Sequence, residues 1–196
     1  MKFLRALRIV VLGVLLPLAA SWAVMSSVHE CFFPSFWSRK ASPVGALSLR
    51  LRLPGTAAGI EEPLMAVGRP GEATFAFIRL LPNARAKVGV EFWGRASFES
   101  PEFALPAQDA EITVSVAVPA LYPPSNDKAW RNVSVAEQEH LTSQYLVSVD
   151  HVLRLQGQIS YPQTIRGPVH IGTNPLGGSL VSDRLTAVIL ADWRQF

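Results

Sequence analysis

Alternation of apolar and polar residues is the feature that most restricts the fold of this chain. Residues 47–53 read Leu-Ser-Leu-Arg-Leu-Arg-Leu, and residues 112–118 read Ile-Thr-Val-Ser-Val-Ala-Val. Successive side chains of a β-strand point to opposite faces of a sheet, so a two-residue period predicts strands with one buried face. We therefore expect the polar side chains between the leucines, including Arg50 and Arg52, to face solvent.

Further strand candidates follow at short intervals, and Pro or Gly pairs such as Pro54-Gly55 and Pro70-Gly71 separate them. These pairs favour turns, and many short strands with such spacing are typical of an all-β domain. The sequence predicts a mostly β fold, an antiparallel β-sandwich or open barrel, over residues 44–196. The further candidates are residues 74–81, 87–98, 145–155, 158–161, 166–171 and 185–190.

One short helix is predicted within this β domain. Ser134 and Glu137 have the spacing of a capping box. In this motif the serine hydroxyl accepts from the backbone N–H of Glu137, and the glutamate carboxylate accepts from the backbone N–H of Ser134. A helix from about residue 135 to residue 144 would follow. Its apolar face is thin, so we expect it on the surface.

The amino terminus has the pattern of a segment handled by the export machinery. Lys2, Arg5 and Arg8 precede an uncharged, largely apolar run from Ile9 to Met25. At about 1.5 Å per residue this run forms a helix almost long enough to cross a bilayer. Residues 1–28 are thus predicted to be a transmembrane signal-anchor, with a signal peptide cut after Ala23 as the alternative.

Residues 29–43 are predicted to be a membrane-proximal linker. Phe32, Phe33, Phe36 and Trp37 suit the headgroup layer of a membrane, and basic residues follow them. The predicted location is the inner (cytoplasmic) membrane, single-pass, with the carboxy-terminal domain in the periplasm. Cleavage would instead leave a secreted or periplasmic protein.

Charge argues against nucleic acid as a partner. The chain has 18 basic and 15 acidic residues and a net charge of +3, and three of the basic residues are Lys2, Arg5 and Arg8. From residue 9 onward, 15 basic side chains balance 15 acidic ones. A nucleic-acid-binding protein needs a basic stripe, which this body lacks.

No complete catalytic or metal-binding motif is present in the sequence. The single cysteine, Cys31, cannot form an internal disulfide, so the fold must rest on its core. We assign no catalytic, cofactor-binding or metal-binding residues and expect no cofactor.

An enzyme or a ligand-binding domain of the cell envelope remains the alternative. Its candidate residues are Asp150, His151, His170 and Asp183, which would have to converge from separate loops. The strand pattern places His151 on an apolar strand face. Residues 172–179 are predicted to be a mobile connection between the last strands.

These observations favour a structural or adaptor subunit of a membrane-associated assembly. The expected partners are the membrane and other envelope or membrane proteins, including further copies of this chain. Free strand edges and Gly-rich loops give β-sandwiches surfaces for such docking.

Overall fold

The computed structural model describes residues 45–56, 59–160 and 167–195. By its contacts the chain divides into two units, Met1–Pro43 and Val44–Phe196, and every described residue belongs to the second. The predicted anchor (1–28) and aromatic linker (29–43) lie outside the described residues and stay predictions.

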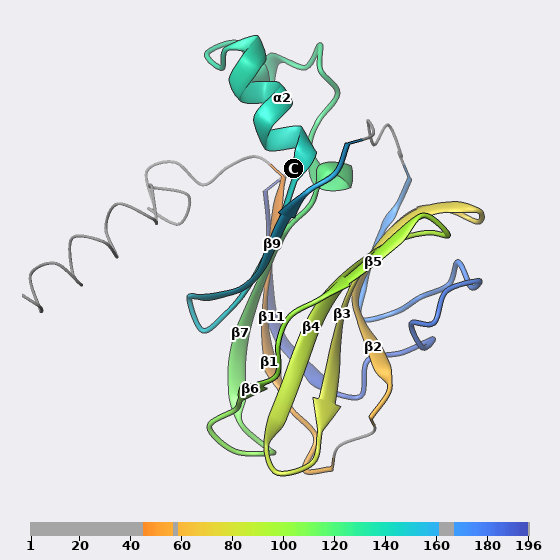
Figure 1. Ribbon diagram of the computed structural model, residues 1–196, viewed down its shortest axis with the longest axis vertical. Coiled ribbons are helices and arrows are strands. Elements are labelled where there is room, and N and C mark those ends of the chain that lie inside the picture. The colour runs from red at the N-terminus through yellow and green to blue at the C-terminus, as the bar shows by residue number, and fades with distance from the viewer. Residues whose placement is uncertain (1–44, 57–58, 161–166, 196) are drawn as a thin grey trace, which may run out of the picture. The chain divides into compact units, whose positions relative to one another are not determined.

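The described domain is an antiparallel β-sandwich, as predicted. One layer is a five-stranded sheet in the order β11-β1-β7-β8-β9 (Figure 1). The first described strand therefore pairs with the last one. The strands are β1 (Ala46–Arg52), β7 (Glu111–Ala117), β8 (Gln144–Val149), β9 (Val152–Gln158) and β11 (Val188–Gln195).

The second layer is a six-stranded sheet in the order β10-β2-β3-β4-β5, with β6 also paired to β4. Its central strands β2, β3 and β4 form a meander, in which each strand pairs with the next along the chain. The strands are β2 (Glu61–Arg69), β3 (Glu72–Leu81), β4 (Arg85–Phe92), β5 (Ala96–Glu99), β6 (Phe103–Ala104) and β10 (Val169–Ile171).

The main hydrophobic core lies between the two sheets. Strand β1 contributes Leu47, Leu49 and Leu51, all fully buried, as the alternation predicted. Burying one such leucine stabilises the fold by about 1.5–3 kcal/mol. The core residues contributed by the other sheet include Leu64, Met65, Ile78, Val88, Val90 and Phe92.

The outer face of β1 is polar, also as predicted. Arg50 and Arg52 both donate to the carboxylate of Glu111 on β7, each at 2.7 Å. These hydrogen bonds, first that from Arg52 and then that from Arg50, hold the pKa of Glu111 below its usual value. Ser48 hydrogen-bonds Ser115 across the same strand pair at 2.7 Å.

Residues 145–155, expected as one long strand, form the hairpin β8–β9. Asp150 and His151 both have positive φ, 49° and 64°, which is the geometry of a two-residue hairpin turn. His151 is therefore exposed in the turn, and its predicted place on an apolar strand face is wrong. The Asp150 carboxylate stabilises the turn, because it accepts from the backbone N–H of Thr113 at 2.8 Å.

The predicted surface helix is α2 (Val135–Ser143), and none of its residues is buried. The side chain of Ser134 accepts from the N–H of Glu137, which confirms the expected helix start. Two 3₁₀ turns precede this helix, η1 (Pro119–Leu121) and η2 (Lys128–Trp130). Trp130, at the end of η2, is buried and stacks on Tyr122.

Two parts of the six-stranded sheet differ from the sequence expectation. Residues 87–98 were predicted as one strand, but the chain turns at Gly94, with φ of 64°, and separates β4 from β5. Strand β2 was not predicted at all. Its Pro63 and Gly68 are residues that usually interrupt strands, and the β2–β3 register shifts between Pro63 and Met65.

Candidate functional site

The four candidate residues of the enzyme alternative lie in three different parts of the sandwich. Asp150 and His151 occupy the β8–β9 turn of the five-stranded sheet, whereas His170 lies on β10 of the other sheet. Asp183 is exposed in the segment after β10, where its carbonyl oxygen accepts from the N–H of Asn174. Among the described residues, no hydrogen bond or ion pair joins any two of these four side chains.

The described part of the chain also offers no metal-binding cluster. It holds no group of three or more His, Cys, Asp or Glu side chains placed to share an ion. His140, three residues after Glu137 on helix α2, instead contacts Gln144 at 2.8 Å through its Nε2 atom.

Residues 172–187, which we call the cover segment, pack over the outer face of the six-stranded sheet through Leu176 and Val181 and reach the main core at Leu185 and Ala187. Most of β2 and β3 is buried on both faces, because the main core covers one side and this segment covers the other. Val181 and Leu176 of the cover segment pack in a second apolar cluster with Phe75 and Phe77 of β3. Predicted as a mobile connection, the first half of this segment is instead packed and hydrogen-bonded.

A buried carboxylate attaches the end of the cover segment to the sheet. Glu62 on β2 is fully buried, and Oε2 accepts from the backbone N–H of Thr186 at 2.6 Å. The hydroxyl of Thr186 also contacts both carboxylate oxygens, at 2.9 and 2.7 Å. A buried carboxylate needs such donors, so the position of Thr186 is tied to that of Glu62.

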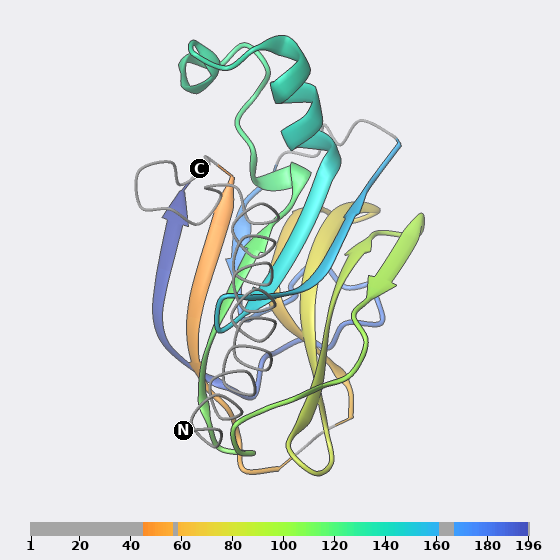
Figure 2. The same ribbon diagram turned by 60° about the vertical axis from the view of Figure 1, so that its left-hand side comes forward.

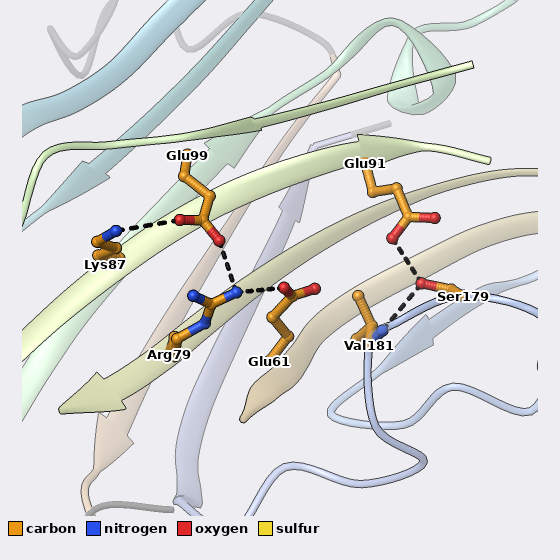
Figure 3. A network of polar contacts seen from close by, with 7 residues as sticks. All are labelled: Glu61, Arg79, Lys87, Glu91, Glu99, Ser179 and Val181. Carbon is orange, nitrogen blue, oxygen red and sulfur yellow. Dashed lines mark hydrogen bonds and ion pairs between the residues drawn. The ribbon is translucent and has the colours of Figure 1, made fainter. Parts of the chain in front are cut away.

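A polar network lies on the outer face of the six-stranded sheet, as Figure 3 shows. Arg79 on β3 pairs with Glu61 on β2 and with Glu99 on β5, and Lys87 on β4 also contacts Glu99. These four side chains are only partly exposed. The two acids lie on the outer two of these four strands and the two bases lie on the strands between them, so the formal charges of the network cancel.

Glu91 connects β4 to the cover segment in the second part of this network. The hydroxyl of Ser179 donates to Glu91 at 2.6 Å and accepts from the N–H of Val181 at 3.0 Å (Figure 3). Gly178 lies against the Trp93 ring, and a Cβ atom there would come within 2.2 Å of it. The Trp93 face is thus occupied by this chain's own residues.

The free sheet edges differ sharply in how open they are to a partner. Both edge strands of the six-stranded sheet are short, with β10 only 3 residues long and β5 only 4. At one edge of the five-stranded sheet, β9 carries Arg154, whose guanidinium lies over the Phe103 ring at 4.4 Å. Short strands and charges directed at the core are features that discourage pairing at an edge.

Strand β11 is the exception, and it is the candidate interaction surface. It is 8 residues long and forms the end of the five-stranded sheet, where β1 is its one partner among the described strands (Figure 2). Val188 and Trp193 are 58% and 54% exposed, and Ile189 and Leu190 are exposed as well. An exposed apolar edge strand offers both unpaired backbone groups and side-chain area to another chain.

Sequence reasoning missed this surface because it depends on sheet order. The alternation of the last residues predicted a strand over 185–190, but nothing local indicates that this strand ends a sheet. The apolar run Val188-Ile189-Leu190 gives no sign of exposure, because such a run is equally typical of a strand that is buried on both faces.

Comparison with known proteins found solved structures with a similar fold but no protein with a matching sequence. No protein-family model matches the chain, and no curated protein matches it. Among solved structures, it is similar to the Ruminococcus gnavus IT-sialidase CBM40 bound to alpha2,6 sialyllactose, with a TM-score of 0.48 and 11% identity over 76% of this chain and 73% of that chain. The same CBM40 bound to alpha2,3 sialyllactose gives a TM-score of 0.45 and 13% identity over 74% and 71%.

The fold and the candidate surface together define the class of the described domain. It is an antiparallel β-sandwich whose most accessible feature is one long apolar edge strand. None of the described helices is both long enough and apolar enough to span a membrane.

Proposed function

We propose that this chain is a membrane-anchored structural or adaptor subunit that docks other proteins of a membrane-associated assembly through the edge of β11. The observation that carries the proposal is the exposure of Val188, Ile189, Leu190 and Trp193 along that edge. Strand addition at a sheet edge gains affinity from backbone hydrogen bonds and specificity from alternate side chains. The dispersal of Asp150, His151, His170 and Asp183 supports this role over an enzymatic one.

The proposal places the chain in the inner membrane, with the β-sandwich on the periplasmic side. The basic residues before Ile9 and the apolar run that follows support this orientation. Protease added to intact spheroplasts should digest the tagged domain. A mature protein that begins at Val24, as measured by mass, would contradict the anchor.

The test of the docking role is the native mass and composition of the tagged full chain, extracted gently from its own membranes. We expect a large, stoichiometric complex. Trp193→Lys should remove the partner, because it replaces an exposed apolar side chain of this edge with a charge. Val152→Lys is the matched control, since Val152 is 47% exposed on β9 at the opposite edge of the same sheet. A wild-type chain recovered alone would overturn the proposal.

A further inference from the structure

We infer that β11 pairs with β11 of a second copy of this chain, antiparallel and centred on Trp193. This inference rests on the proposed function, because both use the same free edge. It goes further by naming the partner and the register. Pairing of this kind would join two five-stranded sheets into one continuous sheet around a two-fold axis.

The two charged residues of β11 restrict which strands can pair with it. Asp192 lies opposite Leu49 on β1, and Arg194 lies opposite Leu47, so both charges are on the core-side face of the sheet. They contact each other at 2.8 Å but remain half-exposed. Trp193 lies opposite Ser48, on the outer face. Charges on a free edge disfavour a partner strand that does not match them.

A second copy of β11 supplies the matching charges. In an antiparallel pair centred on Trp193, Asp192 lies opposite Arg194 of the second copy, and Arg194 lies opposite its Asp192. The four charges then form a square in which every neighbour has the opposite sign. Opposite charges placed directly across two strands stabilise the pair, whereas like charges destabilise it. Trp193 meets its own copy on the outer face, where aromatic pairs are also favourable.

Other registers of self-pairing lose this match. Centring the pair on Asp192 or on Arg194 places two like charges directly opposite each other. A slip of one residue places Asp192 opposite Trp193 or Gln195 of the second copy and leaves it without a cationic partner. A strand from an unrelated protein would need one acid and one base at the same two-residue spacing. The charge pattern therefore favours a second copy in the register centred on Trp193.

Oxidative cross-linking in membranes tests this register with the full chain. In a Cys31→Ser background, Trp193→Cys should form a disulfide dimer, because directly opposed residues have Cα atoms about 4.5–5.5 Å apart. Val188→Cys is the matched control on the same strand and the same face. In this register Val188 lies about 34 Å from its own copy, ten residues along the pair, so it should stay monomeric. Equal cross-linking of both variants, or of neither, would overturn the inference.

Charge exchange provides a second test that does not depend on cysteine. Asp192→Arg makes all four charges positive, and Arg194→Asp makes all four negative. Each variant should weaken self-association at least about tenfold. Mixing the two variants restores the opposite charges across the two strands, although the two charges within each strand are then alike, so heterodimers should form more strongly than homodimers of either variant. Failure of the mixture to associate, when each variant has a wild-type circular dichroism spectrum, would contradict the register.

These outcomes separate the two proposals. If β11 docks a different protein, the wild-type chain stays monomeric by analytical ultracentrifugation from about 1 µM to about 1 mM. In that case Trp193→Lys still removes a partner from the membrane extract, which overturns self-pairing and leaves the docking role standing. If instead β11 pairs with itself, the purified chain alone forms dimers, and Val188→Cys does not cross-link.

Discussion

The carboxylate of Glu62 holds both the backbone N–H and the hydroxyl of Thr186, a residue 124 positions later in the chain. Glu62 is on a central strand of the six-stranded sheet, and Thr186 lies just before β11. Through this contact the sheet positions the start of the strand that forms the candidate interaction surface.

Removal of this carboxylate should destabilise the domain. Glu62→Ala leaves the donors of Thr186 without their acceptor and should lower the free energy of unfolding by about 1–3 kcal/mol. Urea unfolding of the full chain, followed by tryptophan fluorescence, measures this change. Glu72→Gln is the control, because it breaks only the exposed pair with Arg69 and should cost about 0–1 kcal/mol. An equal effect of both variants would contradict the importance of the buried contact.

Gly89 should not tolerate a side chain. A Cβ atom at this position would lie 2.1 Å from the Phe77 ring, which packs across the glycine from the paired position on β3. Gly89→Ala forces the ring to move within a buried cluster and should cost about 1–3 kcal/mol. Gly55→Ala meets no atom within 4 Å and should change stability by less than about 0.5 kcal/mol. A neutral Gly89→Ala in the same unfolding assay would show that this packing is wrong.

The ion pairs of Glu111 make a small part of the stability dependent on acid pH. Because hydrogen bonds from Arg52 and Arg50 lower the folded-state pKa of Glu111, its contribution is present above the unfolded pKa of about 4.3. It is lost as pH falls through the lower folded value. The wild type should therefore lose more stability than Glu111→Gln between about pH 6 and about pH 3. High salt should reduce this difference because the three side chains are exposed.

Tyr122 should make the stability of the fold dependent on alkaline pH, so that the free energy of unfolding falls as pH rises. Burial raises the pKa of Tyr122 to about 12, whereas an unfolded tyrosine ionises near pH 10. The unfolded chain therefore loses this proton first, and the folded state loses stability as pH rises above about 10. Tyr122→Phe should retain more stability than the wild type between about pH 9 and about pH 11. Identical pH profiles for the two chains would contradict burial of the phenol.

Local sequence patterns correctly predicted those elements whose structure depends mainly on their own residues. The alternation around Leu49 predicted β1 and its solvent face, and Ser134 with Glu137 predicted the start of the helix. The hairpin turn at Asp150 and His151 escaped notice because neither residue is glycine, although both adopt positive φ. Strand β2 was not predicted, because Pro63 and Gly68 locally disfavour a strand and only tertiary packing on both faces of the strand overrides that preference.

The candidate surface could not be predicted in the same way. Whether Val188 and Trp193 are exposed depends on which strand lies beside β11, and that pairing involves residues about 140 positions earlier. The same limit applied to His170, which lies on the other sheet from the β8–β9 turn of Asp150, and to Asp183, which lies in the cover segment. A single sequence contains no signal for either relationship.

The pairing of β1 with β11 also determines when the domain can be completed during synthesis. Strand β1 leaves the ribosome early, but its second neighbour begins at Val188, about 70 residues after the end of β7. At about 5–20 residues per second this is a delay of roughly 4–14 s, during which one side of β1 has no partner strand. The meander β2–β3–β4 can form meanwhile from contacts close in sequence, whereas the five-stranded sheet has to close across nearly the whole domain. A chaperone that binds extended apolar segments would therefore have a binding site in the nascent chain at Leu47, Leu49 and Leu51.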